Sequence, residues 1–121
     1  MKSNPILEAI MEAIGNAKGL NISVLDVQEM TDISDHMIIV TGSSNRHVKA
    51  IMNTVVDELR EFRSKPIGIE GEQYAQWILL DYGDVLVHIM TAETREFYNL
   101  ERLWKHTLKV PYGEKVGVAS K

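Results

Sequence analysis

A long amphipathic segment between positions 48 and 62 constrains the fold of this chain most. Its apolar residues recur at i, i+3, i+4, i+7, i+8, i+11 and i+14, namely Val48, Ile51, Met52, Val55, Val56, Leu59 and Phe62. This spacing predicts a helix with one buried face. The Gly42–Asn45 segment before it is typical of a turn and helix cap, and Lys65–Pro66 predicts the end of the helix.

The other elements are predicted from apolar or alternating runs between turn residues. In chain order they are a helix capped by Ser3 or Asn4 that stops at Gly19, strands 21–27 and 36–41, the long helix, an extended piece 67–71, strands 76–81 and 84–90, and a helix 93–106. Tyr82–Gly83 between the last two strands predicts a β-hairpin. This order predicts an α/β (α+β-like) fold with a single mixed β-sheet and helices mainly on one face.

Length and composition limit the classes of function. The chain has 121 residues, which predicts one domain, here 1–107, followed by a mobile tail, 108–121. It has no cysteine, which excludes thiolate chemistry and disulfides. The net charge of -4 disfavours a nucleic-acid partner and suits a basic protein. Neither a signal peptide nor a membrane-spanning run is visible, so we expect a cytoplasmic protein.

The predicted hairpin has two different faces. Ile78 and Leu80 with the β-branched residues of strand 84–90 make a good core face. The opposite face then carries Trp77, Leu79, Leu86, His88 and Met90. Exposed Trp and Leu beside Met is the composition of a protein-binding patch. The alternative is that the last helix or the tail covers this face.

Three carboxylates raise the possibility of a metal-dependent enzyme. Asp26, Asp81 and Asp84 lie on strands or at their ends, and paired carboxylates can hold Mg²⁺ beside a phosphate. Gly42–Ser44 leads into a helix N-terminus, which can bind phosphate. The favoured alternative is that these residues form caps and turns, where Asp and Ser are common anyway. The four histidines show no zinc-binding spacing, and we expect no metal, cofactor or catalytic residue.

Three basic residues crowd the first turn of the long helix. Arg46, His47 and Lys49 oppose the helix dipole there, at about 0.3–1 kcal/mol for each exposed charge. One interpretation is a solvated basic turn that neutralises nearby Asp residues. The other is contact with an acidic partner or a phosphate.

Four segments in order resemble the ribosomal silencing factor family, also called Iojap. The first runs from Thr31 to Ala50 and contains DISDHMIIVTGSSNRHVK. The others are PIGIEG at 66–71, WILLDYGDVLVH at 77–88 and REFYNLERLW at 95–104. Together the motifs cover about the first 105 residues, and their shared order makes the resemblance specific.

The resemblance implies both a fold and a function. It implies a nucleotidyltransferase-like fold without the catalytic acids. It also implies binding to the large ribosomal subunit through ribosomal protein uL14, which keeps the small subunit from joining and represses translation under nutrient limitation. A large-subunit assembly factor that uses the same surface, and a nucleotide-binding or nucleotidyltransferase-like enzyme, remain as alternatives.

The resemblance also implies positions for the partner-binding site. Trp77, Leu79 and His88 would meet the partner on the open hairpin face, and Tyr98 and Leu100 would extend that patch. Arg46, His47 and Lys49 would touch the rim of the partner or nearby rRNA, as a marginal contact. An exposed hydrophobic face could also pair with a second copy, so we expect a possible homodimer when the partner is absent.

Overall fold

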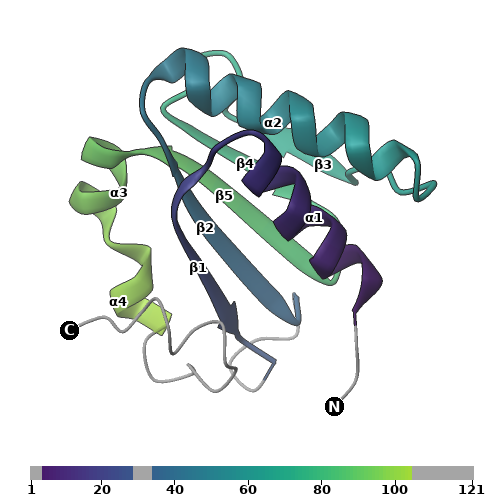
Figure 1. Cartoon of the computed structure of the whole chain (residues 1–121). Helices are drawn as coiled ribbons and strands as arrows, with labels where there is room; N and C mark the ends of the chain where they lie inside the picture. Colours follow the sequence, from purple (N-terminus) through teal and green to yellow (C-terminus); the bar gives the residue numbers. More distant parts are fainter. Residues whose placement is uncertain (1–3, 29–33, 105–121) are drawn as a thin grey trace.

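The protein folds into a five-stranded sheet with helices on both faces (Figure 1). The structure, a computed structural model, describes residues 4–28 and 34–104. The elements are, in chain order, α1 (Pro5–Asn16), β1 (Leu20–Asp26), β2 (His36–Gly42), α2 (Asn45–Arg60), β3 (Gly68–Glu70), β4 (Trp77–Asp81), β5 (Val85–Thr91), α3 (Ala92–Tyr98) and α4 (Leu100–Trp104). The α/β order predicted from the sequence is therefore confirmed as far as α3.

The sheet is mixed, as predicted. Its strand order is β1-β2-β5-β4-β3. β2 and β5 pair in parallel, and every other neighbouring pair is antiparallel. The parallel pair arises because the chain leaves β2 through α2 and returns to β5 only after the β3–β4 hairpin. Both β2 and β5 therefore end at the same edge of the sheet, where Gly42 pairs with Thr91.

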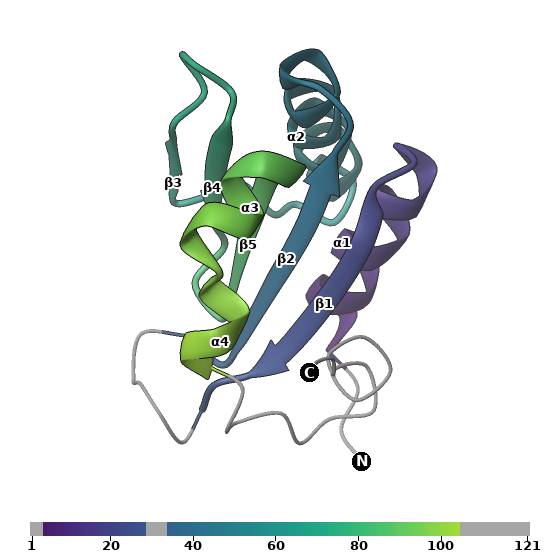
Figure 2. The same cartoon turned by 90° about the vertical axis from the view of Figure 1, so that its left-hand side faces the viewer.

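Helices α1 and α2 cover one face of the sheet, here called the first face (Figures 1 and 2). Five strand residues predicted to form the core side of the hairpin are fully buried there: Ile78, Leu80, Val85, Val87 and Ile89. The predicted stripe of α2 also faces inward, with Val48, Ile51, Met52, Val55 and Leu59 buried. Burial of each such side chain stabilises the fold by about 1.5–3 kcal/mol, so this face holds most of the core.

The second face of the sheet, opposite α1 and α2, buries fewer apolar side chains than the first face and is covered only in part. Its buried cluster consists of Leu25, Val27, Met37, Ile39 and Met90. Segments α3 and α4 lie over this face, on the side opposite α1 and α2 (Figure 2). The expectation of helices mainly on one face holds for α1 and α2, whereas the C-terminal segment packs against the other. Strand β2 is buried on both faces, as its apolar run predicted.

The prediction of a single helix over 93–106 is wrong, because the chain forms two short helices, α3 and α4. Asn99 adopts the left-handed conformation, with φ 48° and ψ 57°, and ends α3 after Tyr98. Asn tolerates this conformation better than most residues, because its short polar side chain can hydrogen-bond locally. The chain then turns and begins a second short helix at Leu100. The rest of the prediction, including His106, lies outside the described residues, as does the tail 108–121.

Phe62 also departs from the predicted pattern. Helix α2 ends at Arg60, and the backbone N–H of Phe62 donates to the Leu59 carbonyl in a tighter turn. Phe62 is consequently 53% exposed and does not belong to the buried stripe. Within residues 4–28 and 34–104, no helix is both long and apolar enough to cross a membrane.

Two of the three predicted helix starts are confirmed by the caps predicted for them. The Asn4 side chain accepts a hydrogen bond from the Leu7 backbone N–H, and the Ser44 hydroxyl accepts one from the His47 backbone N–H, both at 3.1 Å. Such a cap contributes about 1 kcal/mol to helix stability. Ser44 therefore caps α2, and this structural role accounts for part of the Gly42–Ser44 motif.

Helix α1 ends in a Schellman motif centred one residue before the predicted stop. The N–H of Gly19 donates to the Ile14 carbonyl, and the N–H of Lys18 donates to the Gly15 carbonyl. The residue in the left-handed conformation is Lys18, with φ 62°, and not Gly19. A position that usually takes glycine is thus occupied by a residue with a Cβ atom.

We predict that Lys18→Gly raises the free energy of unfolding by about 0.5–1 kcal/mol, because glycine adopts this conformation without strain. Urea unfolding monitored by circular dichroism measures the change. Lys49→Gly, in the interior of α2, is the matched control and should instead lower stability by about 1 kcal/mol. Equal destabilisation by both substitutions would contradict the strain at Lys18.

Candidate protein-binding surface

The register of the β4–β5 hairpin places the predicted site residues on the second face. Trp77 pairs with Met90, Leu79 with His88 and Asp81 with Leu86. Because side chains alternate along a strand, these residues share the face opposite Ile78 and Leu80. The division of the hairpin into two faces predicted from the sequence is confirmed.

The predicted openness of this face is only partly correct. Met90 is fully buried and His88 is 8% exposed, while Trp77, Leu79 and Leu86 are half-buried. The reason is that α3 and α4 lie over β5 and β2 on this face (Figure 2). The alternative in which the C-terminal segment covers this face therefore holds for the region around Met90.

Aromatic side chains from α3 extend the remaining surface. The Tyr98 ring lies 4.8 Å from the Trp77 ring, and Phe97 meets Tyr98 edge-on at 4.9 Å between centroids. Phe97 is 79% exposed and Tyr98 is 52% exposed. We call Trp77, Leu79, Phe97 and Tyr98 the aromatic patch. Such rings combine large contact area with few rotatable bonds, which favours protein binding.

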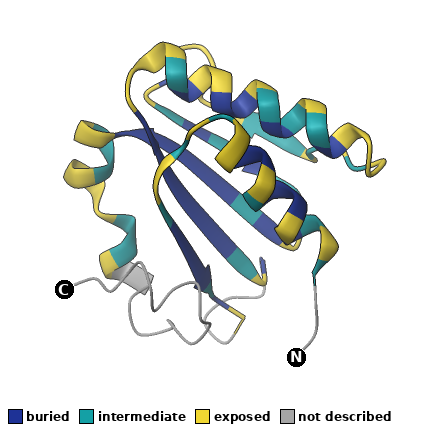
Figure 3. Cartoon of the chain, viewed as in Figure 1, coloured by how far each residue is buried: buried dark blue, intermediate teal, exposed yellow. Residues whose placement is uncertain are grey.

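Phe97 was missed by the sequence analysis. In a continuous helix over 93–106, Phe97 would align with Leu100 and Trp104 at i, i+3 and i+7 and would be expected to face the sheet. The break at Asn99 removes that alignment. The exposed residues of α3 are visible against the buried strands in Figure 3.

Leu100 does not extend the patch outward. It is half-buried and packs against the cluster of Leu25, Val27, Met37, Ile39 and Met90. Its position follows from the turn at Asn99, which directs the start of α4 toward the sheet. Leu100 therefore supports the surface from below, whereas Tyr98 forms part of it.

Trp77 and His88 are joined by a hydrogen bond beneath the patch. The Trp77 indole Nε1–H donates to His88 Nδ1 at 2.9 Å, so Nδ1 must be the unprotonated ring nitrogen. Burial lowers the pKa of His88 from 6.5 to about 4. His88 is thus a neutral acceptor near pH 7, and it fixes the orientation of the Trp77 ring from below.

The three basic residues of α2 have different roles. Arg46 and Lys49 are exposed. His47 is half-buried and makes two hydrogen bonds: its Nδ1 accepts from the Ser43 backbone N–H, and its Nε2 donates to the Ala17 carbonyl, both at 2.8 Å. These bonds connect the start of α2 to the end of α1. Within the predicted basic turn, His47 therefore has a structural role, because its hydrogen bonds connect α2 to α1.

The predicted carboxylates support turns. Asp26 accepts from the Gln28 backbone N–H at 3.1 Å, and Asp81 accepts from the Gly83 backbone N–H at 2.8 Å. Asp84 is exposed in the β4–β5 turn. In the part of the chain that the structure describes, no group of three or more His, Asp or Glu side chains is placed to hold a metal ion.

Comparison of the fold with solved structures points to one class of protein. A crystal structure of a Chromobacterium violaceum protein superposes with a TM-score of 0.83 at 38% identity, covering 99% of this chain and 98% of that one. A family model described as "Ribosomal silencing factor during starvation" matches residues 1–120. The chain belongs to this ribosomal silencing factor family.

Two relatives have names that refer to the ribosome. The ribosomal silencing factor RsfS of Chromobacterium violaceum is 39% identical over 104 residues, which cover 86% of this chain and 85% of that protein. The mouse protein named mitochondrial assembly of ribosomal large subunit protein 1 is 31% identical over 101 residues, covering 81% of this chain and 44% of the mouse protein. The resemblance found from the sequence motifs is confirmed.

Proposed function

We propose that this chain binds the large ribosomal subunit through ribosomal protein uL14 and thereby blocks joining of the small subunit in the cytoplasm. The observation that supports this most is the aromatic patch, in which exposed Phe97 and Tyr98 adjoin Trp77. Occupying the subunit interface is a steric mechanism, so it requires no catalytic residue. Translation would fall because fewer subunits can associate.

Charge and surface chemistry fit a basic protein partner. The net charge of -4 attracts a basic ribosomal protein at long range, which raises the rate of encounter. The aromatic patch then supplies affinity, with Trp77 and Tyr98 as the expected centre. Exposed Arg46 and Lys49 are the candidates for a marginal contact with rRNA at the rim.

We predict that Trp77→Ala weakens binding to purified large subunits at least tenfold, since aromatic residues at the centre of an interface often contribute about 2 kcal/mol or more. Co-sedimentation at increasing subunit concentration measures this. Phe97→Ala tests the patch without disturbing His88, because Phe97 is 79% exposed and lies outside the Trp77–His88 hydrogen bond. We expect it also to bind more weakly.

Phe62→Ala is the matched control for these variants. Phe62 is likewise an exposed aromatic residue, but it follows α2 and lies outside the aromatic patch. It should co-sediment like wild type. If Trp77→Ala and Phe97→Ala both bind as tightly as wild type while remaining folded by circular dichroism, the aromatic patch is not the binding surface.

A role in assembly of the large subunit is the second candidate, favoured by the name of the mouse relative. The two roles differ in their effect on mature ribosomes. Purified small and large subunits can be mixed with and without the protein and separated on a sucrose gradient. Fewer joined ribosomes would support the anti-association role. Unchanged joining despite binding would support assembly instead.

A homodimer formed through the same patch is a further proposal for the free protein. It predicts that light scattering at increasing concentration detects a dimer that Phe97→Ala weakens. A monomer at all concentrations would contradict it.

A further inference from the structure

Helix α3 is held on the sheet mainly by polar contacts. No residue of α3 is buried, and Leu100 at the start of α4 is only half-buried. Burial of apolar surface by α3 itself therefore contributes little to its position. Yet α3 carries Phe97 and Tyr98, half of the aromatic patch. An interaction other than apolar burial by α3 is therefore needed to fix this helix if the patch is to exist before a partner binds.

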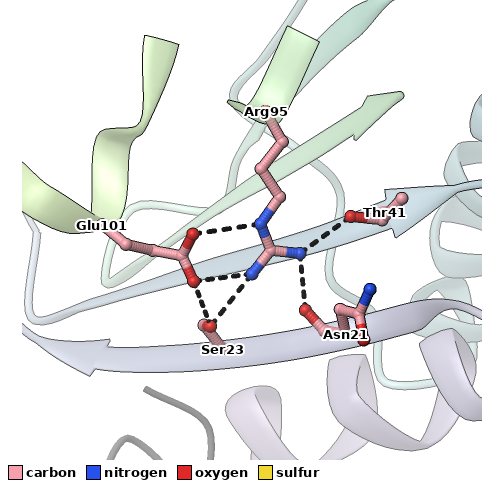
Figure 4. Close-up of polar contacts among 5 residues, drawn as sticks. All are labelled: Asn21, Ser23, Thr41, Arg95 and Glu101. Atoms are coloured by element: carbon pink, nitrogen blue, oxygen red, sulfur yellow. Dashed lines mark hydrogen bonds and ion pairs between the residues drawn. The ribbon is translucent and has the colours of Figure 1, made fainter. Parts of the chain in front are cut away.

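Arg95 provides that interaction (Figure 4). Its Nε and Nη2 donate to the two oxygens of Glu101, at 3.1 and 2.6 Å. Nη2 also donates to the Ser23 hydroxyl at 3.0 Å, and Nη1 donates to the Thr41 hydroxyl at 2.9 Å and to the Asn21 carbonyl. Ser23 in turn donates to Glu101. One guanidinium thus joins α3, α4, β1 and β2.

The sequence folds locally to make these contacts possible. The β1–β2 register shifts between Leu20 and Ser23, and Asn21 within this irregularity has φ 50° and turns its carbonyl to Arg95. In one continuous helix, residues six apart would differ by about 9 Å along the axis and about 120° around it. Arg95 could not then meet Glu101. The left-handed Asn99 between them brings the two side chains together.

The ion pair is shielded enough to be strong. The Arg95 side chain is 12% exposed and the Glu101 side chain 30% exposed. Burial by itself raises the pKa of Glu101, but the hydrogen bonds from Arg95 and Ser23 and the charge of Arg95 outweigh it and lower that pKa. A bidentate Arg–carboxylate pair is also directional, so it fixes orientation as well as distance.

We propose that Arg95 is a positioning residue for the aromatic patch: by joining Glu101 to β1 and β2, it fixes α3 so that Tyr98 stays against Trp77. Tyr98 follows Arg95 by three residues on the same helix, so the guanidinium sets where the Tyr98 ring lies. The patch is then formed before the partner arrives, and binding does not have to order it. The effect on binding rests on the proposed function, whereas the effect on Tyr98 does not.

Arg95→Met tests this, with Arg102→Met as the matched control. Both substitutions remove one positive charge from the same segment, but Arg102 is exposed. The first readout is the Trp77 indole N–H signal in NMR, assigned by its loss in Trp77→Phe. The Trp77 and Tyr98 ring centroids are 4.8 Å apart, so this signal is sensitive to the position of the Tyr98 ring. We expect the signal to shift or broaden in Arg95→Met and to remain unchanged in Arg102→Met.

The second readout is co-sedimentation with large subunits at a temperature where each variant is fully folded. We expect Arg95→Met to bind at least tenfold more weakly than wild type and Arg102→Met to bind normally. Arg95→Lys should not restore wild-type binding, because one ammonium cannot reach both carboxylate oxygens and both strands. Val48→Ala, which destabilises the opposite face, should leave the indole signal and binding unchanged.

A second pair of variants tests the same idea without touching the ion pair. Asn99→Gly keeps the left-handed turn and should preserve the indole signal, whereas Asn99→Ala disfavours it and should disturb the signal. An unchanged indole signal in Arg95→Met, or wild-type binding by this variant, would overturn the proposal. If the wild-type chain fails to bind subunits, the proposed function is wrong, and the indole signal still decides whether Arg95 positions Tyr98.

Discussion

Gly71→Ala is expected to lower the free energy of unfolding by about 3 kcal/mol, although Gly71 is exposed. Gly71 has φ +85°, and a Cβ atom there would lie 2.1 Å from the carbonyl oxygen of Trp77. Backbone atoms cannot yield like the end of a flexible side chain. The substitution therefore combines strain in the left-handed region with a clash that displaces the loop before β4.

The position of this loop makes Gly71 relevant to the aromatic patch. The Gly71 carbonyl accepts from the Ala75 N–H at 3.0 Å, and Gln76 at the end of the turn accepts from the Thr91 N–H at 3.0 Å. These bonds fix the chain immediately before Trp77. If the loop moves, the Trp77 backbone moves with it, so Gly71→Ala should also weaken subunit binding in the proposed function.

Urea unfolding measures the change, and Gly15→Ala is the control within the same chain. Gly15 lies in α1, and nothing approaches within 4 Å of the Cβ atom that alanine would add. Because alanine favours a helix more than glycine does, Gly15→Ala should stabilise the protein by up to about 1 kcal/mol. If Gly71→Ala lowers the free energy of unfolding by less than about 1 kcal/mol, the loop before β4 moves to accommodate the Cβ atom at little cost.

Regular patterns made the central part of the fold predictable. The stripe of α2 and the alternation of the hairpin each depend on many residues, so single exceptions such as Phe62 do not hide them. The hairpin alternation also identified Trp77 and Leu79 as residues on the second face. Gly83 at φ +86° completes the turn that the Tyr82–Gly83 pair indicated.

The C-terminal segment was less predictable because single residues decide it. Asn99 alone separates α3 from α4, and asparagine occurs in helices as well as in left-handed turns. Without that break, neither the exposure of Phe97 nor the contact between Arg95 and Glu101 follows from the sequence. The hydrogen bonds that hold His47 likewise depend on where α1 ends relative to α2, which no local pattern determines.

Acidification is expected to destabilise the protein through His88. Its pKa is lowered by burial from 6.5 to about 4, so the unfolded chain takes up a proton at a higher pH than the folded chain. The contribution of neutral His88 to the free energy of unfolding is therefore complete above pH 6.5, and it is lost as the pH falls toward 4. Linkage gives about 1.4 kcal/mol for each pH unit in this window, or about 3 kcal/mol in total.

The window between pH 6.5 and 4.5 separates His88 from Glu101, since the lowered pKa of Glu101 affects stability only below its usual value of 4.5. His88→Asn is the appropriate comparison because the amide oxygen offers Trp77 Nε1–H an acceptor near the position of Nδ1 and does not titrate. Urea midpoints across this window should fall with pH in wild type and stay nearly flat in His88→Asn. Equal slopes in the two proteins would mean that another group takes up the proton. A protonated His88 would turn an N–H toward the indole N–H, so the Trp77 indole signal should change over the same pH range.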